Sequence, residues 1–70
     1  MLTVREQEIF NAIKTYISIY GIPPSMKDIA EREKISVARV KYYLDILHKK
    51  KYIKKTDKIA RSLVILKEEL

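Results

Sequence analysis

The 70-residue chain contains no cysteine and no tryptophan, and it has a single glycine and a single histidine. Without cysteine, disulfides and thiolate metal sites are excluded, and His48 alone does not make a histidine-built metal site. No apolar run approaches the ~18 residues of a membrane-spanning helix, and no signal-peptide pattern is present. We therefore expect a cytoplasmic protein without metal, cofactor or membrane partner.

Groups that carry out catalysis are also scarce. The sequence shows no glycine-rich phosphate loop, no nucleophile–base pair and no pair of carboxylates in a catalytic pattern. The only glycine, Gly21, is placed to end a helix. The sequence therefore predicts that the chain is not an enzyme, and it indicates no small-molecule ligand.

The positive charge is concentrated in the second half of the chain. Residues 34–66 contain ten Lys or Arg and two Asp, a net charge of +8, whereas residues 1–33 contain four Lys or Arg and five Asp or Glu, a net charge of −1. A basic half beside a neutral half is the electrostatic footprint of a polyanion-binding protein. The alternative is a solvated lysine-rich surface, and charge alone does not separate the two.

The N-terminal part predicts one long helix, over about 3–20. Thr3 and Glu6 have the spacing of a capping box, in which each side chain bonds the backbone N–H of the other residue. Gly21 is expected to end the helix in a left-handed conformation. Between these ends, apolar residues recur at helical spacing: Ile9, Phe10, Ile13, Tyr16, Ile17 and Tyr20.

A second, shorter helix is predicted over about 25–33, after an extended segment imposed by Pro23 and Pro24. Ser25 and Asp28 form a second capping box at its start. Its apolar face is short and consists of Met26, Ile29 and Ala30.

A third helix is predicted over about 36–49, with Ser36 as its N-cap. Only two or three residues join it to the second helix, and Ile35 is expected to be the buried residue of this turn. An apolar stripe at spacings of three and four anchors the helix to the core: Val37, Val40, Leu44 and Leu47.

The segment 52–66 predicts a β-hairpin, because residues 52–55 and 62–66 are rich in strand-forming types and 56–58 is turn-like. Strand alternation would place Tyr52 and Ile53 on opposite faces. Two helices with a short turn and a basic hairpin define a winged helix-turn-helix. We therefore expect a mainly α fold with a small β-hairpin, a three-helix winged helix-turn-helix that occupies residues 1–70 as a single domain.

Several motifs resemble the N-terminal domain of the LexA repressor family. The chain is similar to that family in Leu2-Thr3-Val4-Arg5-Glu6-Gln7, in Gly21-Ile22-Pro23-Pro24-Ser25, in Asp28-Ile29-Ala30 and in Lys50-Lys51-Tyr52-Ile53, where the family has Lys-Gly-x-Ile. The resemblance covers about 65 residues and implies a winged helix-turn-helix that binds double-stranded DNA. The family's self-cleaving peptidase domain has no counterpart in these 70 residues.

The middle of the third helix departs from that family. Residues 38–42 differ from the usual ones, and these positions include those that read bases in the family. The turn before the helix is also about one residue shorter. The resemblance therefore implies the fold and the DNA-binding class, and it does not imply the same operator sequence.

Base contacts are predicted for the exposed face of the third helix. Arg can bridge O6 and N7 of guanine, and a Tyr ring offers an apolar face to a thymine methyl group. Asp45 is expected to pair with Lys41 or to point away from the DNA backbone. A solvated surface carrying this pair is the alternative. The predicted contact residues on this helix are Ser36, Ala38, Arg39, Lys41 and Tyr42.

Phosphate contacts are predicted at two other places. The free N–H groups and positive end of the second helix favour an anion near Ser25 and Lys27, although Ser25 also acts as a cap. On the hairpin, the predicted residues are Lys55, Lys58 and Arg61, with Arg61 matching the wing arginine of the resembled family. The run Lys49-Lys50-Lys51 is instead expected to be a group of solvated cations after the third helix.

Together these features predict a sequence-specific double-stranded DNA-binding protein, a transcriptional repressor or regulator of a prokaryotic cytoplasm or a virus-infected host cytoplasm. A domain this small should bind one half-site weakly, so high affinity would require a homodimer on a palindromic site. Two alternatives remain at this point: a winged helix that binds a protein in a larger assembly, and an RNA-binding protein.

Overall fold

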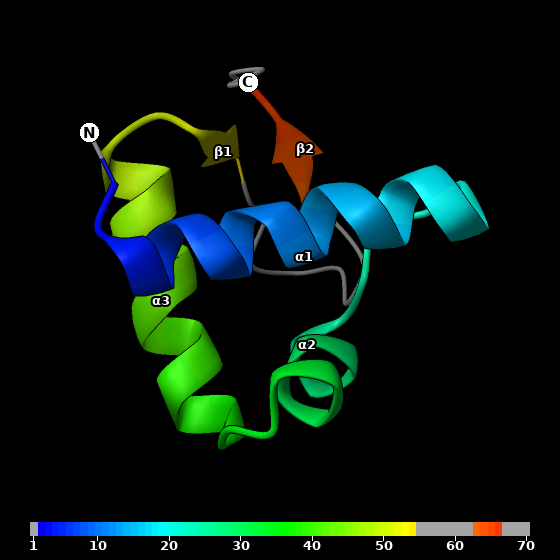
Figure 1. Ribbon diagram of the computed structural model, residues 1–70. Helices are drawn as coiled ribbons and strands as arrows, with labels where there is room; N and C mark the ends of the chain where they lie inside the picture. The colour runs from blue at the N-terminus through cyan, green and yellow to red at the C-terminus, as the bar shows by residue number, and fades with distance from the viewer. Residues whose placement is uncertain (1, 55–62, 67–70) are drawn as a thin grey trace.

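A computed structural model describes residues 2–54 and 63–66 of the chain. It contains α1 (Val4–Tyr20), α2 (Met26–Glu33), α3 (Val37–Lys49), β1 (Ile53–Lys54) and β2 (Val64–Ile65). Helix α1 crosses both α2 and α3, and the two strands lie on the other side of α1 from α2 (Figure 1). The predicted order of three helices followed by a hairpin is confirmed.

The helices begin where local hydrogen bonds satisfy their first N–H groups. Thr3 Oγ1 accepts from the backbone N of Glu6 at 3.2 Å, and the backbone N of Thr3 donates to Glu6 Oε1 at 3.1 Å. The second predicted capping box, between Ser25 and Asp28, is present in α2. Ser36 caps α3 by accepting from the backbone N of Arg39 at 3.1 Å.

The three helices end close to left-handed residues. Gly21 has φ of 74°, as predicted, and Lys34 and Lys51 have φ of 58° and 65°. After α3, the backbone N of Lys51 donates to the carbonyl of His48 and that of Tyr52 to the carbonyl of Leu47. This pair of bonds is a Schellman motif, in which glycine is the usual left-handed residue. Lysine occupies that position here.

The turn between α2 and α3 consists of residues 34–36. Lys34 turns the chain, and the backbone N of Ile35 donates to the carbonyl of Ala30 at 3.0 Å. Ile35 is half-buried and packs against the core, as expected for this turn. The short connection fixes α3 beside α2 (Figure 1).

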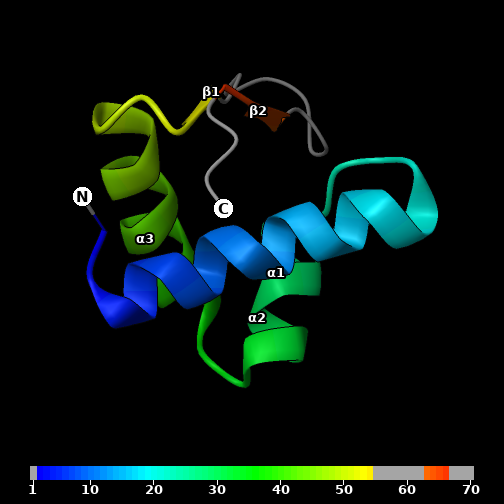
Figure 2. The same cartoon turned by 45° about the horizontal axis from the view of Figure 1, so that its top comes forward.

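The hairpin strands pair antiparallel, with Ile53 opposite Ile65 and Lys54 opposite Val64. The expected alternation between Tyr52 and Ile53 is wrong, because Tyr52 is only 4% exposed and Ile53 is fully buried. Tyr52 precedes the strand and belongs to the Schellman turn of α3, so it does not follow the strand period. The two strands lie above α1 in the tilted view (Figure 2).

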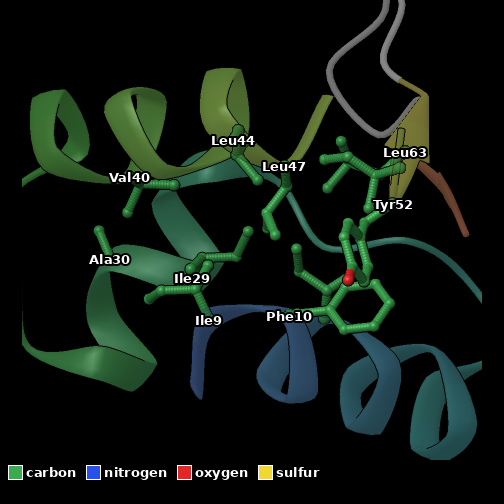
Figure 3. Packing of buried hydrophobic residues seen from close by; sticks show 11 residues of the cluster. Ile9, Phe10, Ile29, Ala30, Val40, Leu44, Leu47, Tyr52 and Leu63 are labelled. Carbon is green, nitrogen blue, oxygen red and sulfur yellow. The ribbon is translucent and has the colours of Figure 1, made fainter. Parts of the chain in front are cut away.

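The core lies between the three helices and the base of the hairpin (Figure 3). The Phe10 and Tyr52 rings meet edge to face with centroids 5.3 Å apart, which joins α1 to the start of the hairpin. Leu44 and Leu47 point from α3 towards this region. The buried apolar cluster consists of Ile9, Phe10, Ile13, Ile29, Ala30, Val40, Leu44, Leu47, Tyr52, Ile53 and Leu63.

Three residues that were predicted to lie on apolar helix faces are exposed. Val37 is 46% exposed because α3 begins there, before the helix reaches the core. Met26 begins α2 in the same way and is 39% exposed. Tyr20 is 61% exposed because the last turn of α1 projects beyond α2 (Figures 1 and 2). The apolar spacing correctly predicted which side of each helix faces the core. The part of that side that the core covers, however, ends before Val37, Met26 and Tyr20.

One acidic side chain is buried at the junction of α1, α3 and the hairpin. Glu6 is 7% exposed and accepts a hydrogen bond from Lys50 Nζ at 2.8 Å. The expectation that residues 49–51 are all solvated cations is therefore wrong for Lys50. Within the part of the chain that the structure describes, no helix is long and apolar enough to span a membrane.

Candidate nucleic-acid interface

Helix α3 presents one face to the core and the opposite face to solvent. Val40, Leu44 and Leu47 are buried, whereas Ala38 and Tyr42 are exposed. Since successive residues are about 100° apart around a helix, the exposed side chains lie on the side away from the core. The core therefore holds the helix from behind and leaves its outer face open.

The N-terminal half of this face forms a shallow, open depression. It is lined by Ser36, Ala38, Arg39 and Tyr42. Tyr42 is 57% exposed, so the ring stands at the edge of the depression and is not packed inside the domain. The structure thus brings together four of the five residues of α3 that the sequence predicted as contacts.

The fifth residue, Lys41, is occupied by an ion pair in this structure. Its Nζ atom lies 3.5 Å from Asp45 Oδ2, one helical turn further along. Both side chains are largely exposed, at 63% and 51%. An ion pair that is this exposed contributes little to stability.

The neighbouring ring of Tyr43 supports Tyr42. The two ring centroids are 5.4 Å apart with an interplanar angle of 67°. Tyr43 is half-buried and packs against the core. This is the edge-to-face geometry that aromatic pairs prefer, so the exposed ring of Tyr42 has one packing contact on its own helix.

The predicted phosphate-binding residues lie on other elements. Ser25 and the exposed Lys27 are at the start of α2. Asp28 occupies the same helix end, where its Oδ2 atom accepts from the backbone N of Ser25 at 2.9 Å and from the hydroxyl of Tyr16 at 3.2 Å. The predicted wing residues Lys55, Lys58 and Arg61 lie outside the described residues.

An ion-pair bridge centred on Arg5 connects two helices and was not predicted from the sequence. Arg5 Nη1 lies 3.0 Å from Glu8 Oε1 and 3.3 Å from Glu33 Oε1, which ties α1 to the end of α2. The hydrogen bond to Glu8 and, to a smaller extent, the charge of Glu33 raise the pKa of Arg5 above its ordinary value. The i,i+3 spacing of Arg5 and Glu8 is visible in the sequence, but the contact between Arg5 and Glu33, which are 28 positions apart, is not.

The arrangement defines a winged helix-turn-helix: α2 and α3 joined by three residues, α1 packed across both, and an antiparallel hairpin after α3. The model of the LexA DNA-binding domain family matches residues 1–62, and the chain belongs to this family.

Individual relatives agree with this assignment. The LexA repressor of Thermosipho melanesiensis is 34% identical over 68 residues, covering 97% of this chain and 34% of the relative. The LexA repressor of Pseudothermotoga lettingae is 37% identical over 65 residues, covering 93% and 32%. That of Staphylococcus epidermidis is 34% identical over 70 residues, covering 99% and 34%. The chain thus spans about a third of the length of these relatives.

Proposed function

We propose that this domain binds double-stranded DNA sequence-specifically, with α3 in the major groove. The observation that carries the proposal is the depression lined by Ser36, Ala38, Arg39 and Tyr42 on the solvent side of α3. An α-helix fits the major groove, where base pairs present distinct patterns of donors, acceptors and methyl groups. Arg39 is suited to guanine and the ring of Tyr42 to a thymine methyl group.

Charge around α3 supports the same function. Residues 34–54 contain seven Lys or Arg and one Asp. Of these cations, Lys50 donates a hydrogen bond to Glu6 within the domain. The exposed cations are Lys34, Lys49, Lys51 and Lys54. Exposed cations at both ends of a helix that reads bases would neutralise phosphates and position the helix in the groove.

The remaining contacts follow from the same orientation. The hairpin would lie along the DNA backbone or in the adjacent minor groove, with Lys55, Lys58 and Arg61 as its contact residues. Ser25 and Lys27, at the start of α2, would contact a phosphate across the groove. Lys41 would leave Asp45 for a phosphate or a guanine.

We propose transcriptional repression as the consequence of this binding, in a prokaryotic cytoplasm. A domain that occupies the groove at a promoter blocks polymerase by occupancy, and this role requires no catalytic step. Because one small domain buries a modest area, a homodimer on a palindromic site would supply the affinity of a repressor.

Selection from a pool of random duplexes, with the 70-residue chain as bait, tests the proposal. A sequence-specific domain should enrich a defined motif and bind it far more than tenfold tighter than a random duplex. Arg39→Ala should weaken that preference. Equal binding to all duplexes, or stronger binding to RNA of the same sequence, would contradict the proposed function and favour a protein-binding or RNA-binding role.

A further inference from the structure

Asp45 lies on the outward face of α3, among the predicted reading residues. It follows Lys41 by four residues and Ala38 by seven, and these spacings place all three side chains on one side of a helix. Its side chain is 51% exposed. It is also the only acidic residue between Glu33 and Asp57 in the sequence.

A carboxylate at this position opposes binding to DNA unless it finds a donor there. Phosphates on both sides of the groove are negative, so an Asp inserted between them is repelled. The nearby ammonium group of Lys41, at 3.5 Å, offsets part of this repulsion. In the free domain the two side chains form a neutral pair in the middle of an otherwise basic segment.

Only the exocyclic amino groups of cytosine and adenine offer hydrogen-bond donors in the major groove. The amino group of adenine stands beside the N7 acceptor, which repels a carboxylate. Cytosine carries no acceptor of its own on the major-groove edge, and the nearest acceptor there, O6 of the paired guanine, already accepts from the same amino group. Cytosine is therefore the base that best matches an Asp side chain.

We infer that Asp45 is a specificity-determining residue that accepts a hydrogen bond from the amino group of a cytosine in the bound site. Lys41 then exchanges Asp45 for a phosphate or a neighbouring guanine. The inference rests on the proposed function, because it assumes that α3 enters the major groove. It extends that function by one base pair and explains why a basic helix carries an acid on its reading face.

The test compares Asp45→Ala and Asp45→Asn with the unaltered chain on a panel of duplexes. The panel starts from the motif enriched by selection and changes each base pair in turn. Asp45→Ala should lose about fivefold or more of the discrimination for a C·G pair at one position, and it should bind a random duplex at least as tightly as before. Asp45→Asn should shift the preference at that position towards adenine, which pairs with Asn through N6 and N7.

Glu31→Ala is the matched control, because Glu31 is an exposed acid on α2 and its loss changes the net charge by the same amount. This variant should keep the wild-type preference at every position. If Asp45→Ala also keeps every preference while the unaltered chain discriminates strongly, the inference is wrong and the proposed function stands. If the unaltered chain does not discriminate among duplexes, the proposed function fails and the inference fails with it.

Discussion

Lys50 Nζ lies 2.8 Å from Glu6 Oε1, although the two residues are 44 positions apart in the chain. Glu6 belongs to the capping box of α1, and Lys50 is the C-cap of α3. Their hydrogen bond therefore ties the start of α1 to the point where α3 ends and the hairpin begins. Since Glu6 is buried and Lys50 is partly exposed, the carboxylate depends on this partner and on Thr3.

This pair predicts a specific loss of stability in acid. The hydrogen bond from Lys50, followed by that from the backbone N of Thr3, lowers the pKa of Glu6 below its ordinary value of 4.5. A group whose pKa is lowered by folding stabilises the fold above its unfolded pKa, and this contribution disappears as the pH falls through the folded pKa. The free energy of unfolding should therefore begin to decrease below about pH 4.5.

Urea unfolding, followed by far-ultraviolet circular dichroism from about pH 7 to about pH 3, measures this effect. Glu6→Gln should be less stable than the unaltered chain at pH 7, and the difference should shrink in acid because Gln does not titrate. Glu31→Gln, which changes an exposed carboxylate, serves as the control. If the decline in acid were the same with and without Glu6, another group would be responsible.

The exposed position of Val37 gives a second prediction, on the packing of α3. Val40 is fully buried and Val37 is 46% exposed, although both were predicted to anchor the helix. Val40→Ala should destabilise the domain by about 2 kcal/mol, because it removes two buried methyl groups and leaves a cavity. Val37→Ala should change the free energy of unfolding by less than about 0.5 kcal/mol. Equal losses in denaturant unfolding would mean that Val37 is part of the core.

The helix starts could be predicted because their signals are local. Each N-cap forms its hydrogen bonds within one helical turn, so four consecutive residues are enough to predict where the helix begins. This holds for Thr3 with Glu6, for Ser25 with Asp28 and for Ser36. The order of the elements and the outward position of Arg39 and Tyr42 follow from the same short-range patterns. The helix starts, the order of the elements and the exposure of these two side chains are therefore what the sequence predicts correctly.

Features that depend on tertiary contacts could not be predicted in this way. An apolar period indicates which side of a helix is buried, but it does not indicate where along the axis the neighbours end, as Val37 and Tyr20 show. The partner of Lys50 lies on another helix, and in the sequence that lysine is indistinguishable from its neighbours. Tyr52 was assigned to a strand because of its residue type. The Schellman turn that contains it could not be predicted, because its left-handed residue is Lys51 and not glycine.

Lys51 gives a third prediction, on the end of α3. Its φ of 65° is unfavourable for a residue with a side chain, and the LexA family resemblance places glycine at this position. Lys51→Gly should stabilise the domain by about 1 kcal/mol. The substitution relieves the strain of the left-handed backbone, and this gain is partly offset by the greater conformational entropy of glycine in the unfolded chain. Thermal or urea unfolding measures the change.

Lys49→Gly is the matched control for Lys51→Gly. The same substitution at the last residue of α3 should destabilise the domain by about 0.5 kcal/mol, because glycine is a poor helix former but costs less at a helix end than in its interior. Opposite signs at two positions only two residues apart would establish that backbone conformation, and not loss of a lysine charge, decides the effect. Destabilisation by both variants would contradict the left-handed assignment of Lys51.

The last prediction separates reading of bases from attraction to phosphates. Arg39 lines the depression on α3, and an Arg in the major groove can bridge O6 and N7 of a guanine. Arg39→Ala should therefore cost about 1–3 kcal/mol on the selected duplex and relax the preference at one position. Lys58→Ala, at the predicted wing, should weaken binding to selected and random duplexes by a similar factor and reduce the salt dependence by about one charge.

Fluorescence anisotropy titrations of both variants, on the selected and a random duplex at several salt concentrations, measure these quantities. The comparison is informative because the two substitutions remove the same charge, so a purely electrostatic interaction would respond to both alike. A base-reading Arg39 changes the ratio of the two affinities, whereas a phosphate-binding Lys58 leaves that ratio intact. If both variants produced the same uniform loss, α3 would not be the helix that reads bases, and the proposed orientation of the domain in the major groove would be wrong.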